Sequence, residues 1–226
     1  GENGAGKSTL VKTIMNMVKP NGGYVKIFGR APKAGISRIG YVPQRETVDW
    51  DFPVTVMDVV LMGRYGHLGW LRKIGETDRR IACECLEQVH MLPYANRQIG
   101  NLSGGQQQRV FLARALAQES SLYLMDEPFA GVDAVTEKTI VSILKGMRDR
   151  GKTLVIVHHD LASAREYFDH LLLLNMRKVA YGKTGEVFKP DLLQKTYGGR
   201  LSILSDMASK SAGVRVIEKE AYFTEK

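Results

Sequence analysis

The sequence lacks the long apolar run that a membrane-spanning helix needs, and it contains only two cysteines among 226 residues. No stretch approaches the roughly 18–20 apolar residues that cross a bilayer, and the leucine run at 171–174 is typical of a buried strand, which we expect to be the last strand of the core. No secretory signal sequence is visible. Cys83 and Cys85 are two positions apart on an expected helix, so their side chains point to different faces and cannot readily pair. We therefore expect a reduced, cytosolic chain with two structural cysteines.

The chain has fewer acidic residues than basic residues. The chain has 32 Lys and Arg residues against 24 Asp and Glu residues, a formal net charge of +8. Such an excess suits nucleic acid, an anionic membrane face or nucleotide phosphates. No basic run is interleaved with aromatic residues in the manner of a base-stacking platform, and charge alone does not decide the partner. The length fits one large domain or a domain with a subdomain.

The first nine residues, GENGAGKST, match the phosphate-binding pattern G-x-x-x-x-G-K-[ST]. Their glycines permit positive φ, so that backbone N–H groups can turn inward around an anion. Residues 7–17 look helical, and the start of that helix would also face the phosphates. Lys7 would contact the β- and γ-phosphates and the Ser8 hydroxyl would bind Mg²⁺. The alternative is a glycine-rich turn that binds nothing, in which Lys-Ser after the last glycine would have no purpose.

The position of this pattern at residue 1 carries a further expectation. A phosphate-binding loop normally follows a buried strand, and the first residue is not Met. We therefore expect a fragment that lacks the preceding strands and the group that packs on the adenine ring.

Apolar periodicity predicts the remaining elements. The expected strands are 24–28, 39–42, 121–127, 153–157, 171–174 and 179–182. The expected helices after the first are 55–63, 77–90, 107–118, 135–149 and 191–197. Thr55 is placed to cap its helix, with Asp58 completing a capping box. Pro93 is expected to end the segment that contains the helix 77–90.

A second anion-binding sequence, Leu102-Ser103-Gly104-Gly105-Gln106, precedes the helix expected at 107–118. Ser103 is placed as an N-cap, and Gly104 and Gly105 expose backbone amides at the helix start. Two phosphate sites with a single phosphate-loop lysine predict one nucleotide held between two copies of the chain. An ordinary capped helix is the alternative, but it would not need two glycines and a glutamine after the serine.

Acidic and amide side chains follow two of the expected strands. The strand 121–127 ends in Asp126 and Glu127, at the carboxyl edge where α/β sites lie. Asp126 would hold Mg²⁺ through water, and Glu127 would orient and deprotonate an attacking water. Gln44 follows the strand 39–42, where an amide can bind Mg²⁺ and position water. Taken alone, such a glutamine is more often an ordinary loop residue.

Histidines follow the strand 153–157, at His158-His159-Asp160. A histidine here could reach a γ-phosphate, and we prefer His159 because alternation along a strand sends the two rings to opposite faces. Polar termination of the strand is the alternative, and a metal site is disfavoured because no further Cys or His cluster supports it. The aromatic and acidic loop 48–53 is either a partner surface beside Gln44 or a cover for the core by Trp50 and Phe52.

Found in this order, these motifs resemble the ATP-binding subunit of an ABC transporter, from residue 1 to about residue 200. The resemblance implies an α/β fold: a P-loop NTPase of the ABC type, with a mostly parallel core sheet flanked by helices and an inserted α-helical subdomain. The core is expected at 1–44 and 119–201 and the helical subdomain at 45–118. The tail, 202–226, stays unassigned.

The resemblance also implies an ATP hydrolase whose cofactors are ATP and Mg²⁺. The catalytic residues would be Glu127, the Q-loop residue Gln44 and the switch histidine His159. The Mg²⁺ ligands would be Ser8, Gln44 and Asp126. The residues that bind the nucleotide would be Gly1, Asn3, Gly4, Ala5, Gly6, Lys7, Ser8, Thr9, Ser103, Gly104, Gly105, Gln106 and the D-loop residue Asp133.

By the same resemblance, the chain forms a head-to-tail dimer with a second copy and drives a membrane permease from the cytoplasmic face of the membrane. The segments 48–53, 61–64, 158–159 and 196–201 are similar to the manganese, zinc and iron importers, which also use an extracytoplasmic metal-binding protein. No nucleic-acid partner is expected. The alternatives are an ABC ATPase for another imported or exported substrate, or a soluble one that acts on DNA or ribosomes. The latter is disfavoured because the space between Gln44 and Leu102 is too short for a long coiled coil.

Overall fold

The computed structural model describes residues 4–44, 50, 52–68 and 73–198. The chain divides into two compact units. The larger unit is Ser8–His159, and the smaller one joins the residues up to Lys7 with those from Asp160 onward. Among the helices that the structure describes, none has the length and apolar character needed to span a bilayer.

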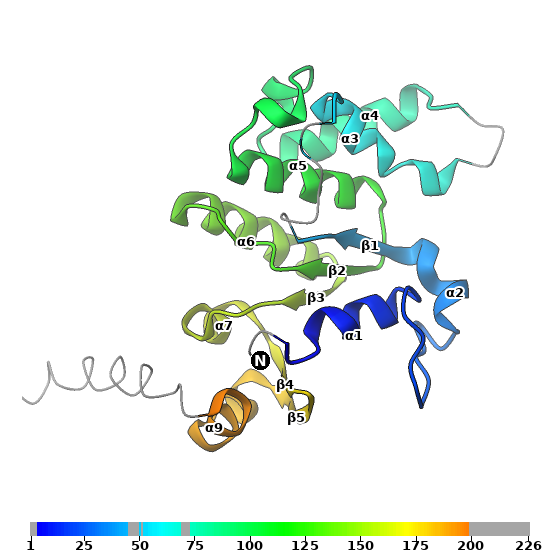
Figure 1. Ribbon diagram of the computed structural model, residues 1–226. Coiled ribbons are helices and arrows are strands. Elements are labelled where there is room, and N and C mark those ends of the chain that lie inside the picture. The colour runs from blue at the N-terminus through cyan, green and yellow to red at the C-terminus, as the bar shows by residue number, and fades with distance from the viewer. Residues whose placement is uncertain (1–3, 45–49, 51, 69–72, 199–226) are drawn as a thin grey trace, which may run out of the picture. The chain divides into compact units, whose positions relative to one another are not determined.

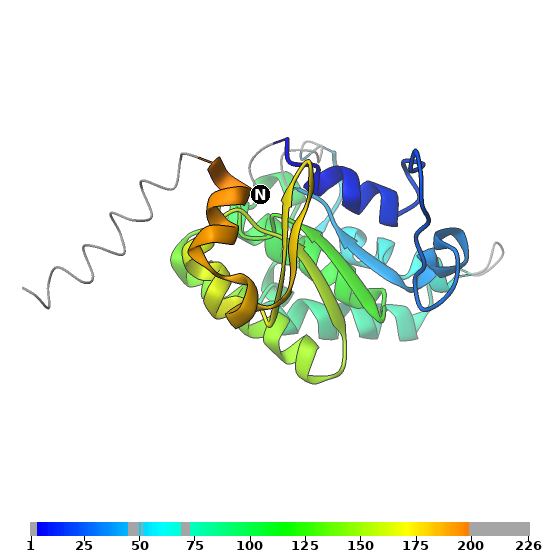
Figure 2. The ribbon, with the colours of Figure 1, turned by 90° about the horizontal axis from the view of Figure 1, so that it is seen from below.

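A parallel sheet lies at the centre of the larger unit (Figures 1 and 2). Its strands are β1 (Ile39–Val42), β2 (Leu122–Asp126) and β3 (Thr153–Val157), in the order β1-β2-β3. The register places Val42 opposite Met125. Because the strands are parallel, all three carboxyl ends lie at one edge of the sheet. The three parallel strands predicted for this part of the chain are confirmed.

Alternation along β2 divides the core of this unit between the two faces of the sheet. On one face Leu122 and Leu124 pack with Val11 of the helix α1 (Lys7–Ile14). On the other face Tyr123 and Met125 pack with apolar residues of the helices α5 (Gly104–Ala117) and α6 (Ala134–Asp149). Every residue of β2 is buried, as a central strand covered on both sides requires.

Three helices of the larger unit pack against one another in a group beside the sheet (Figure 1). They are α3 (Val56–Met62), α4 (Glu76–Gln88) and α5 (Gly104–Ala117). The predicted capping box at the start of α3 is present: Asp58 N donates to Thr55 Oγ1 at 3.2 Å, and Thr55 N donates to Asp58 Oδ2 at 3.0 Å. Local sequence therefore determines where this helix begins.

The long helix α6 (Ala134–Asp149) follows β2 and contributes Ile140, Leu144 and Met147 to the core, with Ile143 partly buried against it. Short helical turns make the remaining connections in this unit. They are α2 (Pro32–Gly35), η1 (Ile36–Arg38), η3 (Tyr65–His67), η4 (Leu92–Tyr94) and η5 (Ile99–Asn101).

The smaller unit contains a second sheet. Its strands β4 (His170–Asn175) and β5 (Arg177–Lys183) are antiparallel neighbours, and helix α9 (Pro190–Tyr197) lies along them (Figure 2). The other helices are α7 (Leu161–Tyr167) and α8 (Thr184–Val187).

The prediction that residues 171–174 are the last core strand is wrong. In the described chain they pair with β5 in a separate two-stranded sheet. Leu173 is buried, whereas Leu172 is 43% exposed. A run of four leucines is equally compatible with a strand covered on both faces and with one covered on a single face, so composition could not separate the two cases.

The prediction of a strand at 24–28 is also wrong. Ile27 and Arg30 form an isolated antiparallel bridge, and Tyr24–Lys26 has no regular structure. The turn between the bridge partners has positive φ at both Phe28 (51°) and Gly29 (77°), the backbone of a tight hairpin turn. The alternating pattern was present, but a strand also needs a neighbour with which to pair.

Two helices end earlier than expected. Helix α1 stops at Ile14, and Asn16 follows with φ of 59°. Helix α4 stops at Gln88, ahead of Pro93, and His90 has φ of 56°. Residues in the left-handed region cannot continue a right-handed helix, and asparagine and histidine tolerate that conformation better than most residues do.

Candidate functional site

The glycine-rich loop has the backbone that phosphate binding requires. Gly4 and Gly6 have φ of 81° and 91°, in the region that favours glycine. A Cβ atom at either position would have no heavy atom within 4 Å, so backbone conformation rather than crowding explains the glycines. Between them, Ala5 is buried and its carbonyl accepts a hydrogen bond of 3.2 Å from Met176 N.

Lys7 begins helix α1, and Ser8 and Thr9 lie exposed in its first turn. That turn contains no acidic residue, so the positive end of the helix dipole is not neutralised by a carboxylate within the helix. The predicted residues Gly1 and Asn3 lie outside the described residues.

Side chains of the predicted site follow the ends of all three parallel strands. Gln44 comes two residues after β1, Asp126 ends β2, and His159 comes two residues after β3. Asp126 is opposite Val157 in the sheet, and Glu127 N donates to Val157 O at 3.1 Å. The structure thus brings the predicted catalytic residues of this unit to one edge of the sheet.

Glu127 and His159 are neighbours at this edge. The distance from Glu127 Oε2 to His159 Nδ1 is 3.7 Å, with 18% of the glutamate side chain and 60% of the histidine side chain exposed. His158 has a different contact, since its ring lies edge-on to Phe129 with 5.4 Å between centroids. Glu127 has φ of 50°, a strained value for a residue other than glycine, and sequence reasoning did not predict it.

The start of helix α5 is built as the sequence predicted, although the helix begins at Gly104 rather than 107. Ser103 N donates to Gln106 Oε1 at 2.9 Å, and Gln106 N donates to Ser103 Oγ at 3.4 Å. Ser103 is exposed while Gly104 and Gly105 are half-buried. Gly105 has a second reason to be glycine, because a Cβ atom there would lie 3.2 Å from Thr136 Oγ1 and Cγ2.

Asp133 is the N-cap of helix α6. Its Oδ1 accepts hydrogen bonds from Val135 N (3.0 Å) and Thr136 N (2.9 Å), and its Oδ2 accepts one from Thr136 Oγ1 (2.7 Å). These bonds, with those from Thr136 first, lower the pKa of Asp133 below its usual value. Asp133, the cap of α6, and Gly105 of α5 therefore both lie next to Thr136.

Ser8, Gln44 and Asp126 all belong to the larger unit and offer a hydroxyl, an amide and a carboxylate. Oxygen donors of these kinds fit Mg²⁺. Asp126 itself is only 6% exposed. Within the described part of the chain, no group of three or more His, Cys, Asp and Glu side chains is arranged to hold a metal ion, and the segment 158–160 is not such a group.

Arg114, which sequence reasoning did not single out, also reaches this region. Its Nη2 donates to Tyr41 O of β1 at 3.3 Å. Burial lowers the pKa of Arg114, and burial raises the pKa of the Tyr41 hydroxyl, which the charge of Asp126 raises further. The sequence signal was weak, since Arg114 lies on a helix that otherwise looked like a simple amphipathic element.

The two aromatic residues of the loop after Gln44 differ in exposure: one covers the core and the other lies at the surface, where a partner could bind. Trp50 is half-buried and packs edge-on against Phe111 of α5 with 4.9 Å between ring centroids. Phe52 is 57% exposed. Residues 48, 49 and 51 lie outside the described residues.

Comparison with known proteins agrees with these motifs. Residues 1–130 match the family described as ABC transporter. The manganese transport system ATP-binding protein MntB of Bacillus subtilis is 56% identical over 206 residues, which cover 91% of this chain and 82% of that protein. The zinc transport system ATP-binding protein TroB of Treponema pallidum is 55% identical over 202 residues, 89% of this chain and 76% of that protein.

Solved structures have the same fold. MJ1267, an ATP-binding cassette of an ABC transporter in its ADP conformation, superposes with a TM-score of 0.74 at 26% identity, covering 88% of this chain and 86% of that one. The dimeric post-hydrolysis state of the ATP-binding cassette MJ0796 with ADP and Pi gives 0.71 at 31% identity, over 81% and 83%. The predicted α/β P-loop fold is confirmed, and this chain belongs to the ABC transporter family as an ATP-binding subunit that hydrolyses ATP.

Proposed function

We propose that this ATPase powers the import of a metal ion, manganese, zinc or iron, through a membrane permease. The support is the identity above 50% with proteins named for manganese and zinc transport. The resemblance of the segments 48–53, 61–64, 158–159 and 196–201 to such importers points the same way. Metal choice belongs to the permease and an extracytoplasmic binding protein, because this chain meets the nucleotide and not the metal.

The nucleotide is held by two parts of the chain. Backbone amides of the phosphate loop surround the β- and γ-phosphates, and Lys7 neutralises part of their charge. The loop contribution comes from Gly1, Asn3, Gly4, Ala5, Gly6, Lys7, Ser8 and Thr9. The second contribution comes from Ser103, Gly104, Gly105 and Gln106, with Asp133 beside them.

Glu127 accepts the proton of the water that attacks the γ-phosphate. Its position supports this role, since its carboxylate lies next to His159 at the carboxyl edge of the sheet. His159 orients the γ-phosphate and the glutamate, and Gln44 orients the water. Preorganised groups of this kind act mainly by positioning and by stabilising charge in phosphoryl transfer.

A Mg²⁺ ion fits the oxygen donors Ser8, Gln44 and Asp126, and when bound it supplies charge neutralisation at the β- and γ-phosphates. Asp126 suits an indirect contact through water. Removal of this carboxylate should therefore weaken hydrolysis more than it weakens nucleotide binding.

Two copies act together, head to tail, so that the phosphate loop of one faces Ser103–Gln106 of the other. The dimeric state of the related cassette MJ0796 supports this arrangement. The dimer would sit at the cytoplasmic face of the membrane as a peripheral subunit and move the permease when it opens and closes.

The chain divides functionally into an ATPase core, 1–44 and 119–201, and a helical subdomain, 45–118. The packing of α3, α4 and α5 against one another supports this division. Residues 202–226 keep no assigned role.

The observation that carries the proposal is the 3.7 Å approach of Glu127 to His159 in a chain so similar to metal-transport ATPases. The test is metal uptake in cells that lack the chain and receive the wild-type protein, Glu127→Gln, or the control Glu166→Gln. Glu166 is exposed on α7 and belongs to none of the motifs. Wild type and control should restore uptake of at least one of manganese, zinc and iron, and Glu127→Gln should not. Equal uptake of all three metals in every strain would contradict metal import.

A further inference from the structure

The polypeptide on both sides of Gln44 is attached to the same helix. Three residues before Gln44, Tyr41 O accepts the 3.3 Å hydrogen bond from Arg114 of α5. Six residues after it, Trp50 packs edge-on against Phe111 of α5, with 4.9 Å between ring centroids and 60° between ring planes. Helix α5 begins within the anion-binding sequence Leu102–Gln106, the signature sequence, with Ser103 as its N-cap.

The contact of Tyr41 with Arg114 and the contact of Trp50 with Phe111 are linked, because Arg114 and Phe111 touch each other. The guanidinium of Arg114 lies over the Phe111 ring, 4.5 Å from its centroid, so one residue contacts both Tyr41 and the anchor of Trp50. Phe111 is only 6% exposed, which fixes its ring in the core. A Cβ atom at Gly100 would lie 2.9 Å from Trp50 O, so the chain leading into the signature approaches Trp50 as well.

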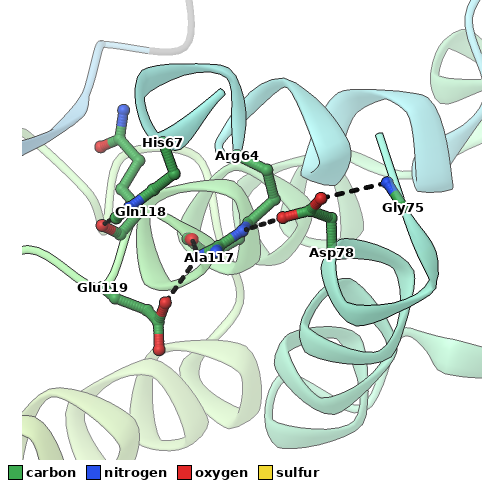
Figure 3. Close-up of polar contacts among 7 residues, drawn as sticks. All are labelled: Arg64, His67, Gly75, Asp78, Ala117, Gln118 and Glu119. Atoms are coloured by element: carbon green, nitrogen blue, oxygen red, sulfur yellow. Dashed lines mark hydrogen bonds and ion pairs between the residues drawn. The ribbon is translucent and has the colours of Figure 1, made fainter. Parts of the chain in front are cut away.

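The last turn of helix α5, which contains Arg114, is also held by a second arginine, Arg64, which Figure 3 shows. Arg64 Nε donates to Asp78 Oδ1 of α4 at 3.1 Å, and its Nη1 donates to Ala117 O (2.7 Å) and Glu119 Oε2 (2.6 Å) at the end of α5. Arg64 directly follows Gly63, the C-cap of α3. These bonds join the ends of α3, α4 and α5 and involve neither Tyr41 nor Phe111, so they stabilise the group of helices without attaching it to the chain around Gln44.

We propose that Arg114 is a positioning residue for ATP hydrolysis, and that it couples the signature helix α5 to Gln44. The clamp formed by Arg114, Phe111 and Trp50 holds the chain before and after Gln44 on α5. When a phosphate engages the start of α5, the helix moves and the Gln44 amide moves with it. This inference rests on the proposed role of Gln44 in orienting the attacking water.

In the full-length protein, the first test compares two arginines that hold the last turn of α5: Arg114, which is half-buried and lies in that turn, and Arg64, which is buried and bonds Ala117 O. Arg114→Met removes the bond to Tyr41 and the contact with Phe111, whereas the control Arg64→Met removes a guanidinium that contacts neither. Both should lower stability. Arg114→Met should lower kcat by about tenfold or more with KM for ATP nearly unchanged, as expected for an interaction used in the transition state. Arg64→Met should keep kcat within about threefold. Equal kinetics of the two variants would overturn the proposal.

A spectroscopic readout reports on the clamp itself. In a Trp70→Phe background, Trp50 is the remaining tryptophan, because the chain has two. Nucleotide should change its fluorescence in that background and in Arg64→Met, and Arg114→Met should abolish the change. Arg114→Lys, which keeps the charge but not the planar stacking group, should give an intermediate response and covers the case in which Arg114→Met does not fold. A wild-type response in both Arg114 variants would contradict the coupling.

A double-mutant cycle with Gln44→Ala separates this inference from the proposed function. If Arg114 acts through Gln44, Arg114→Met should have little further effect on kcat once Gln44 is alanine. If the two losses multiply independently while Gln44→Ala alone lowers kcat, the coupling is wrong and the role of Gln44 stands. If Gln44→Ala alone leaves kcat unchanged, both the role of Gln44 and the coupling are wrong.

Discussion

Glu127 Oε2 lies 3.7 Å from His159 Nδ1, although the two residues follow different strands and are far apart in the sequence. The parallel register explains the approach, since β2 and β3 are neighbours and Asp126 is opposite Val157 at their carboxyl ends. The hydrogen bond from Glu127 N to Val157 O fixes the backbone at the same point. The sheet therefore places a carboxylate and an imidazole side by side where a phosphate can be reached.

Glu127→Gln should stop hydrolysis and leave nucleotide binding intact. The amide keeps the shape of the side chain but cannot accept a proton, and a positioned general base contributes about 10²–10⁴-fold in rate. Turnover and ATP affinity, measured separately, should show a fall of at least about a hundredfold in kcat with affinity within roughly threefold. Unchanged turnover would remove Glu127 from the role of base.

Arg64→Met should destabilise the fold strongly. Asp78 is 3% exposed, and loss of its partner would leave a buried charge, which typically costs about 3–5 kcal/mol. Burial opposes the charged form of Arg64, but its bonds to Glu119 and Asp78 outweigh burial and raise its pKa. Urea unfolding checks the loss, and the double variant Arg64→Met with Asp78→Leu should recover much of it. A loss below about 1 kcal/mol in the single variant would show that the pair is not buried in solution.

Gly63→Ala should be harmful for steric reasons alone. A Cβ atom there would lie 2.2 Å from Arg114 O and 3.0 Å from Val60 O, although φ of −61° suits any residue. Overpacking of this kind typically costs about 1–3 kcal/mol. The matched control is Gly66→Ala, where a Cβ atom meets nothing within 4 Å. Thermal unfolding should separate the two variants, and equal midpoints would contradict the close approach of α3 and α5.

Alkaline pH should destabilise the chain through Cys85. Burial, followed by the charges of Glu119 and Glu84, raises the pKa of this thiol to about 12. The folded state therefore keeps a proton that the unfolded chain releases near pH 9, so stability falls as pH rises from about 9 to 12. Between pH 8 and 10.5, Cys85→Ala should lose less stability than wild type, by an amount on the order of 2 kcal/mol. Equal losses of unfolding free energy in wild type and Cys85→Ala would show that the pKa of the Cys85 thiol is not raised in the folded state.

Features set by neighbouring residues could be predicted from the sequence. The capping boxes at Thr55 and Ser103 depend on residues three positions apart, and both are present. The apolar run of β2 also identified a buried strand correctly. In each case the signal and the structure involve the same few residues, so no knowledge of the rest of the fold was needed.

Features that depend on distant neighbours could not be predicted. Residues 24–28 have a strand pattern without a partner strand, and residues 171–174 pair in a different sheet. The left-handed backbone of Glu127 arises where β2 turns out of the sheet. The hydrogen bond of Arg114 to Tyr41 joins positions 73 residues apart. Long-range pairing of this kind has no local signature in a single sequence.

Complementation between two inactive variants tests the central claim, that each ATP is shared by two copies, most directly. Lys7→Ala disables the phosphate loop and Ser103→Arg disables the signature, so each variant alone should be inactive. In a mixed head-to-tail dimer, one site carries both defects and the other carries none. Randomly mixed subunits should therefore recover ATP hydrolysis up to about a quarter of the wild-type rate, since half of the dimers are mixed and each has one intact site of two. If mixing the two variants restores no hydrolysis while each still dimerises with wild type, the nucleotide is not shared between copies and the account is wrong.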